Sequence, residues 1–255
     1  TKNNRLFFEE IDRNNPVLMA QAANTAKRCH AIVCVNAMHK TPTGYRNTTH
    51  VFDREGVLVG RYYKTHPAPS EVKTEKEGGN ELDCSYSYEF REPDVIEIEG
   101  IRFGFMTCYD FYFYEAFPKI ARKNVDVIIG CSHQRSDTHD ALETMTRFCA
   151  YNTNAYVLRS SVSMDENSNI GGASMVVAPT GETLINMYSR VGLQTVDIDF
   201  NKKYYKPAGF GNPDAPHYEY IEYGRNPWQY RNSGTSMSDT DARLSYPRVC
   251  AHRGF

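Results

Sequence analysis

The sequence lacks several features that would assign it to a common functional class. Its 255 residues carry a net charge of −2, and lysine and arginine are scattered without a basic stripe of the kind that phosphate backbones need. No apolar run approaches the roughly 20 residues of a membrane-spanning helix, and the best one, residues 125–130, has the length of a strand. We therefore expect neither nucleic acid nor a membrane as a partner.

The cysteines also exclude common structural roles. There are seven of them, an odd number, and no pair shows the C-x-x-C spacing of a zinc ribbon. A disulfide framework is thus not expected, and a reducing, cytoplasmic compartment fits best. The irregular spacing of His133, Asp137 and His139 does not indicate a metal site.

What is present is the pattern of a globular α/β protein. Apolar residues make up 40% of the chain, and helical and strand-like segments alternate. This alternation predicts a layered α/β fold with a mixed sheet. The expected helices span residues 16–30, 113–122 and 138–152. The expected strands span residues 31–35, 49–53, 57–63, 95–99, 101–106, 125–129, 155–159, 173–177, 182–187 and 192–199. Residues 67–88 are polar and are expected to form a long loop.

Cys108 lies where a hydrophobic strand ends and a helix is expected to begin. A turn from strand to helix exposes its side chain and directs backbone N–H groups toward whatever that side chain attacks. A thiolate at this position can act as a nucleophile, with the N–H of Tyr109 as an oxyanion donor. Position alone does not exclude a buried structural cysteine.

Lys64 ends another predicted strand and is followed by Thr65, His66 and Pro67. A lysine there can stabilise negative charge as a point cation. Taken alone, it fits a solvated surface lysine far better.

Five segments together resemble the nitrilase, or carbon–nitrogen hydrolase, superfamily. Residues 60–66 resemble its lysine motif, and Phe105-Met-Thr-Cys-Tyr-Asp110 resembles its cysteine motif. Residues 47–56, 149–156 and 172–181 resemble further family segments in the same order and spacing. The resemblance extends over residues 16–200.

The resemblance implies an αββα sandwich and a Glu–Lys–Cys triad that hydrolyses a non-peptide carbon–nitrogen bond through a thioester. Cys108 would be the nucleophile, and Lys64 with the Tyr109 N–H would hold the oxyanion. Small linear amides or N-carbamoyl compounds are the implied substrates, with ammonia released and nitriles less favoured. The resemblance implies no cofactor. It does imply a homodimer or a larger homo-oligomer.

Other site residues follow from the same resemblance. Glu71 occupies the place of a second family glutamate and would orient Lys64, although it also reads as an ordinary loop residue in a charged run. Ser132 and His133 resemble the turn that lines the substrate pocket, with a plain polar turn as the alternative. Tyr112 takes the place of a family arginine, which makes a carboxylate-bearing substrate less favoured and an apolar or sugar-like one conceivable.

The triad glutamate departs from the family pattern. The family places it after a strand–helix–strand unit that does not precede the helix expected at 16–30. Glu9 and Glu10, in Phe7-Phe-Glu-Glu10, resemble the glutamate motif only superficially. We therefore expect the missing unit and its glutamate to lie upstream of Thr1. Without that glutamate, the alternative is a catalytically inactive, oligomeric binding module.

The domain boundary is placed near residue 203. Residues 1–203 are expected to form the nitrilase-like domain, and residues 204–255 a C-terminal extension or linker. Residues 246–255 weakly resemble the opening of a glycerophosphodiester phosphodiesterase domain. A further domain after Phe255 is one hypothesis, and a simple C-terminal tail is the other.

Overall fold

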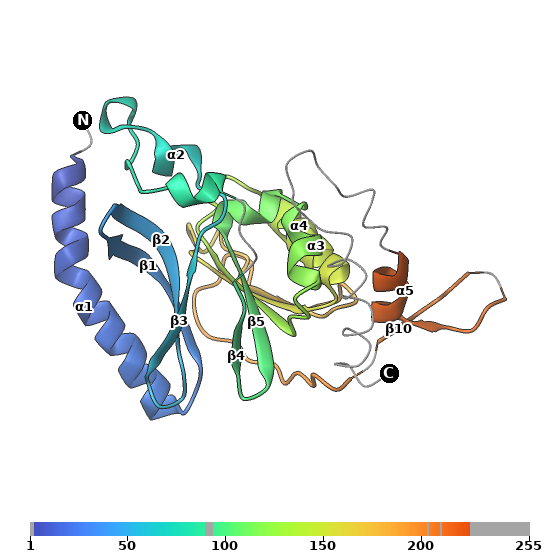
Figure 1. The fold of residues 1–255 in the computed structure, drawn as a ribbon. Helices are drawn as coiled ribbons and strands as arrows, with labels where there is room; N and C mark the ends of the chain where they lie inside the picture. Colours follow the sequence, from blue (N-terminus) through green and yellow to red (C-terminus); the bar gives the residue numbers. More distant parts are fainter. Residues whose placement is uncertain (1–2, 90–93, 203, 210, 225–255) are drawn as a thin grey trace.

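The computed structural model describes residues 3–89, 94–202, 204–209 and 211–224. Two sheets lie face to face between helices, so that the layers run from α1 through β1–β3 and β4–β9 to α3 and α4 (Figure 1). This is the αββα sandwich that the sequence predicts. Residues 246–255, on which the phosphodiesterase hypothesis depends, lie outside the described residues.

The first sheet has three antiparallel strands: β1 (Val33–Thr41), β2 (Gly44–Phe52) and β3 (Leu58–Tyr63). Helix α1 (Asn4–Cys29) covers its outer face (Figure 1). Ala22 and Ala26 are buried against Phe52 at this interface, because small side chains allow a close approach of helix and sheet.

The second sheet has six strands in the order β4 to β9. They are β4 (Ile96–Ile98), β5 (Ile101–Thr107), β6 (Val127–Ser132), β7 (Tyr156–Ser161), β8 (Met175–Val177) and β9 (Thr183–Asn186). The pairs β5–β6 and β6–β7 are parallel, and the other pairs are antiparallel. The carboxyl ends of β5, β6 and β7 therefore meet at one edge of the sheet.

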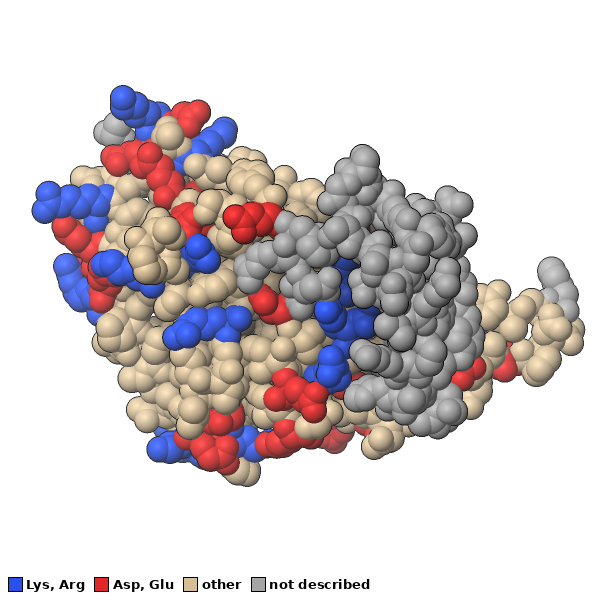
Figure 2. Space-filling model, viewed as in Figure 1, with Lys and Arg blue, Asp and Glu red and all other residues tan. Residues whose placement is uncertain are grey.

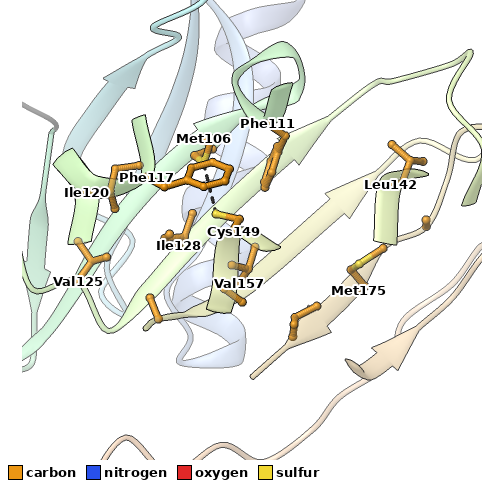
Figure 3. Close-up of a cluster of buried hydrophobic side chains, with 14 residues drawn as sticks. Met106, Phe111, Phe117, Ile120, Val125, Ile128, Leu142, Cys149, Val157 and Met175 are labelled. Carbon is orange, nitrogen blue, oxygen red and sulfur yellow. Dashed lines mark hydrogen bonds between the residues drawn. The ribbon is translucent and has the colours of Figure 1, made fainter. Parts of the chain in front are cut away.

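Helices α3 (Ala116–Ala121) and α4 (His139–Thr153) cover the outer face of this sheet. Figure 3 shows the buried cluster that joins them to the strands, with the thiol of Cys149 3.6 Å from the sulfur of Met106. Cys149 is fully buried, and burial raises the pKa of its thiol above the ordinary range. It acts as a packing residue and not as a reactive one.

The faces of the two sheets that point toward each other form the inner core. Its fully or largely buried members come from strands of both sheets and from the segment after β8: Val51, Tyr62, Phe103, Phe105, Val127, Tyr156 and Ala178. Three strands face six, so the packing is uneven. Beside β1 lies a cavity of about 320 Å³, lined by Cys34 and by inner-face residues such as Cys131 and Leu158.

The sequence-based helix at 16–30 was too short. Helix α1 begins at Asn4 because the side chain of Asn3 caps it, accepting a hydrogen bond from the Leu6 N–H at 3.1 Å. Pro16 lies inside the helix rather than at its start. The strand expected at 192–199 was wrong, since these residues pair with no strand in the described part of the chain and Leu193 is 88% exposed.

The remaining described elements are short. The expected loop at 67–88 contains α2 (Pro69–Val72) and the 3₁₀ helices η1 (Glu75–Glu77) and η2 (Ser85–Tyr88). After the sandwich come β10 (Tyr205–Lys206), β11 (Ala215–Pro216) and α5 (His217–Gly224). Within the described residues no helix is both long enough and apolar enough to cross a bilayer. Both charge signs are interspersed on the face shown in Figure 2.

Candidate active site

Cys108 lies at a sharp turn directly after β5, as the first residue of the 3₁₀ helix η3 (Cys108–Tyr112). Its φ is +50°, a left-handed conformation that costs an L-residue about 1–2 kcal/mol. Such strain persists only where the surroundings enforce it, and it is common at reactive positions. The side chain is half-buried, which leaves the thiol accessible at the edge of the sheet.

Asp110 enforces this turn. Its carboxylate accepts hydrogen bonds from the Thr107 N–H and the Tyr62 hydroxyl, each at 2.7 Å, and it is only 1% exposed. It also accepts from the His66 N–H at 2.7 Å. Burial, and then the charge of Asp110, raise the pKa of Tyr62 well above its ordinary value, so the phenol stays a donor.

Lys64 follows β3 and is paired inside the protein. Its Nζ lies 2.5 Å from Oε2 of Glu71, and the two residues are 2% and 6% exposed. Glu71 also accepts hydrogen bonds from the Asn47 side chain and from the Ala68 N–H, both at 2.6 Å. A buried carboxylate with these partners fixes the position of the ammonium group.

These two positions lie at the same edge of the sandwich. Tyr62, two residues before Lys64, bonds to Asp110, two residues after Cys108. The hydroxyl groups of Thr49 and Thr107 also meet across the sheets at 3.5 Å. The structure therefore places a half-buried thiol in a strained turn and a buried, oriented cation at the same edge of the sandwich, and such groups can serve as a nucleophile and as an oxyanion partner.

Comparison with known proteins shows the family of the chain. The sequence pattern of the family described as Carbon-nitrogen hydrolase matches residues 9–204. The chain belongs to this family. Two curated Mycobacterium tuberculosis proteins described as hydrolases are 29% identical over 123 residues, which is 43% of this chain and 44% of each relative. The matched part thus spans less than half the length of these relatives.

Solved structures show the same carbon–nitrogen hydrolase fold. A mutant amidase from Nesterenkonia sp. AN1, with the acetamide moiety of fluoroacetamide on its active-site cysteine, has a TM-score of 0.63 at 17% identity and covers 88% of this chain and 74% of its own. Another mutant of that amidase, in complex with butyramide, has a TM-score of 0.57 at 16% identity, over 72% and 66%. A carbon–nitrogen hydrolase from Helicobacter pylori G27 has a TM-score of 0.58 at 20% identity, over 74% and 69%.

The three residues predicted to line the substrate pocket lie in three different surroundings. The Tyr112 hydroxyl donates to the carboxylate of Asp137, and burial raises the pKa of Tyr112 to about 12. Ser132 ends β6, and its buried hydroxyl has no hydrogen-bond partner among the described residues. The side chain of His133 is exposed.

Glu9 and Glu10 are not at the site. Both lie on α1, across the three-stranded sheet from the strands that carry Cys108 (Figure 1). Glu9 is ion-paired with Arg5, and Glu10 with Arg13, and all four side chains are well exposed. The hypothesis that one of them is the catalytic glutamate is therefore wrong for this arrangement, because the helix that carries them packs on the opposite face of that sheet.

Sequence reasoning missed three residues that shape this site. Asp110 stands in the quoted cysteine motif, so its position was visible but its role in holding the turn was not. Asn47 on β2 holds Glu71 on α2, a contact that no local pattern indicates. Arg159 is a charged residue at the end of a predicted buried strand, and that conflict with burial is a signal that could have found it.

Proposed function

We propose that this chain hydrolyses small linear amides or N-carbamoyl compounds by a cysteine mechanism that releases ammonia. The sulfur of Cys108 attacks the carbonyl carbon, and the carbonyl oxygen becomes an oxyanion held by Lys64 and by the Tyr109 N–H. The carbon–nitrogen bond then breaks, and the thiol proton leaves with the nitrogen. Water hydrolyses the thioester to the acid and restores the thiol.

The observation that carries this proposal is the buried Lys64–Glu71 pair at the same edge as the Cys108 turn. Without a function, a buried ammonium and a strained, half-buried cysteine would both be costly to retain. The neighbouring amidase with acetamide on its active-site cysteine supports the assignment of a cysteine nucleophile. The butyramide complex of that amidase supports a small linear amide as substrate.

One observation favours the alternative, a catalytically inactive binding module. Glu71 and Asp110, the buried carboxylates at the described site, each already accept several hydrogen bonds, so neither is free to accept the thiol proton. Both readings include a homodimer or larger homo-oligomer, which light scattering of the purified chain measures directly.

Ammonia release separates the two readings. Butyramide, an N-carbamoyl amino compound and butyronitrile are offered to the chain and to Cys108→Ala. If the chain is a hydrolase, the native chain should release ammonia from butyramide and from the N-carbamoyl compound, and the variant should release none. Binding of butyramide without ammonia from any compound would instead support the inactive module.

A further inference from the structure

Arg159 is a buried cation close to the Cys108 turn. It lies on β7, opposite Gly130 of β6, and is only 3% exposed. Gly130 in turn pairs with Met106, two residues before Cys108. The absence of a side chain at Gly130 leaves room there, since a Cβ would lie 3.4 Å from the Arg159 Cα and 2.8 Å from the Phe111 ring.

The hydrogen bonds of Arg159 all reach neutral oxygens. Nη1 donates to the carbonyl oxygens of Gly172 and Ala173 at 2.8 and 2.7 Å, and Nη2 donates to Oε1 of Gln134 at 3.1 Å. Among the described residues no carboxylate forms an ion pair with it. Burial of a guanidinium without a counter-ion destabilises the protein, and a nearby negative charge would offset this penalty.

A chain of contacts leads from Arg159 to the turn. Gln134, which Arg159 holds, donates to Asp137 at 3.5 Å, and Asp137 accepts from the Tyr112 hydroxyl. Tyr112 is the last residue of the 3₁₀ helix that begins at Cys108. Arg159 is thus connected to both ends of the segment that carries the nucleophile, at one end through strand register and at the other through hydrogen bonds.

The charges around Arg159 point the same way. Burial lowers its pKa to about 10, and attraction to Cys108, then to Asp137 and Tyr112, acts against that lowering. The guanidinium is therefore still charged at neutral pH.

We propose that Arg159 is a positioning residue for Cys108. The buried positive charge of Arg159 favours the thiolate of Cys108, and its hydrogen bond to Gln134 holds the segment whose Asp137 anchors Tyr112. The proposal rests on the proposed role of Cys108 as the nucleophile. When the thiol ionises, its proton passes to water, and a proton returns from water to the nitrogen that leaves. The guanidinium stays protonated, and the sulfur is left with the electron pair that forms the bond to carbon. Arg159 itself neither gains nor loses a proton.

Alkylation of Cys108 by iodoacetamide tests this, with the rate read from the mass of the peptide that carries it. At about pH 7, Arg159→Met is expected to react about tenfold more slowly than the native chain, a deficit that shrinks toward about pH 9, where more of the thiol is ionised. Arg159→Lys, which keeps the charge, should restore most of the rate. Cys29, which is exposed on α1, gives the internal reference within each sample.

Arg147→Met is the matched control, because Arg147 also donates to a backbone carbonyl, that of Gly181 at 2.7 Å, but lies on α4. It should leave the alkylation of Cys108 unchanged. If Arg159→Met unfolds, the comparison is made between Arg159→Lys and Arg159→Gln, both of which remain polar. Equal rates for these two, or a deficit that is the same at every pH, would overturn the proposal.

Alkylation requires no turnover, so the two proposals can fail separately. A chain that releases no ammonia but shows the pH-dependent effect of Arg159 retains this inference and loses the hydrolase function. A chain that releases ammonia but whose Cys108 reacts independently of Arg159 retains the function and loses this inference.

Discussion

Nζ of Lys64 and Oε2 of Glu71 lie 2.5 Å apart, and each side chain is less than a tenth exposed. Glu71 is fixed in turn by Asn47 and the Ala68 N–H. This relationship sets the direction in which Lys64 presents its charge at the edge of the sandwich, and it makes both residues sensitive to replacement.

Replacement of Glu71 by Gln is the first prediction. It leaves a buried ammonium without a counter-ion, so the free energy of unfolding should fall by about 3–5 kcal/mol. Urea unfolding measures the change. Glu75→Gln, an exposed residue a few positions along the same segment, should change stability by less than about 0.5 kcal/mol. Equal stability of the two variants would contradict the pairing.

Tyr62→Phe tests the link between the sheets. It removes one hydrogen bond to the buried carboxylate of Asp110 and should cost about 1–3 kcal/mol. The same change at Tyr205, which is 56% exposed, serves as the control and should be nearly neutral. Because Asp110 holds the Cys108 turn, Tyr62→Phe should also lower the alkylation rate of Cys108. Unchanged stability would mean that this bond does not join the two sheets.

Gly130→Ala should disturb the Cys108 turn by displacing Phe111. Its Cβ would lie 2.8 Å from the Phe111 ring, closer than the ring can tolerate without moving. Overpacking of this kind costs about 1–3 kcal/mol, and here it displaces a residue of η3. Phe111→Leu in the same chain should recover part of the lost stability, as measured by thermal unfolding. No recovery would indicate that the strain lies elsewhere.

Acid should destabilise the protein through two buried histidines. Burial lowers the pKa of His50 to about 4, with contributions from Arg61 and His39, and burial with a contribution from Lys206 lowers that of His217 to about 4. Unfolded histidine has a pKa of 6.5, so the unfolded chain binds more protons below that pH. The stability that these neutral histidines contribute is complete above pH 6.5 and is lost as the pH falls toward 4.

Each histidine should contribute about 1–2 kcal/mol of this loss by about pH 5. His217→Gln should reduce the pH dependence of the free energy of unfolding, measured in urea at several pH values above 5. His30→Gln, at the C-cap of α1 and exposed, should leave the dependence unchanged. The same slope in all three proteins would exclude a role for His217.

The sequence predicted the features that local pattern carries. The ends of β3 and β5 were visible from their hydrophobic runs, and Lys64 and Cys108 stand directly after them. The face-to-face sheets followed from the family resemblance, and the structural neighbours share this fold. What local pattern did not carry was contact between distant segments: Asn47 with Glu71, Tyr62 with Asp110, and Arg159 with Gln134.

Two errors have physical causes of the same kind. Alternating apolar residues at 192–199 predicted a strand, but a strand also needs a neighbour to pair with, and this segment has none in the described structure. The cap at Asn3 makes the first helix start at Asn4, well before the residues at 16–30 whose periodicity predicted a helix. In both cases the deciding interaction lay outside the window in which the pattern was read.

The most direct test of the central claim is the mass of the Cys108 peptide after rapid acid quenching of the chain with butyramide. The cysteine mechanism predicts a butyryl group on this peptide together with released ammonia, and neither with Cys108→Ala. Ammonia release at the native rate by Cys108→Ala, or native turnover with the butyryl group on a different cysteine, would contradict the assignment of Cys108 as the nucleophile.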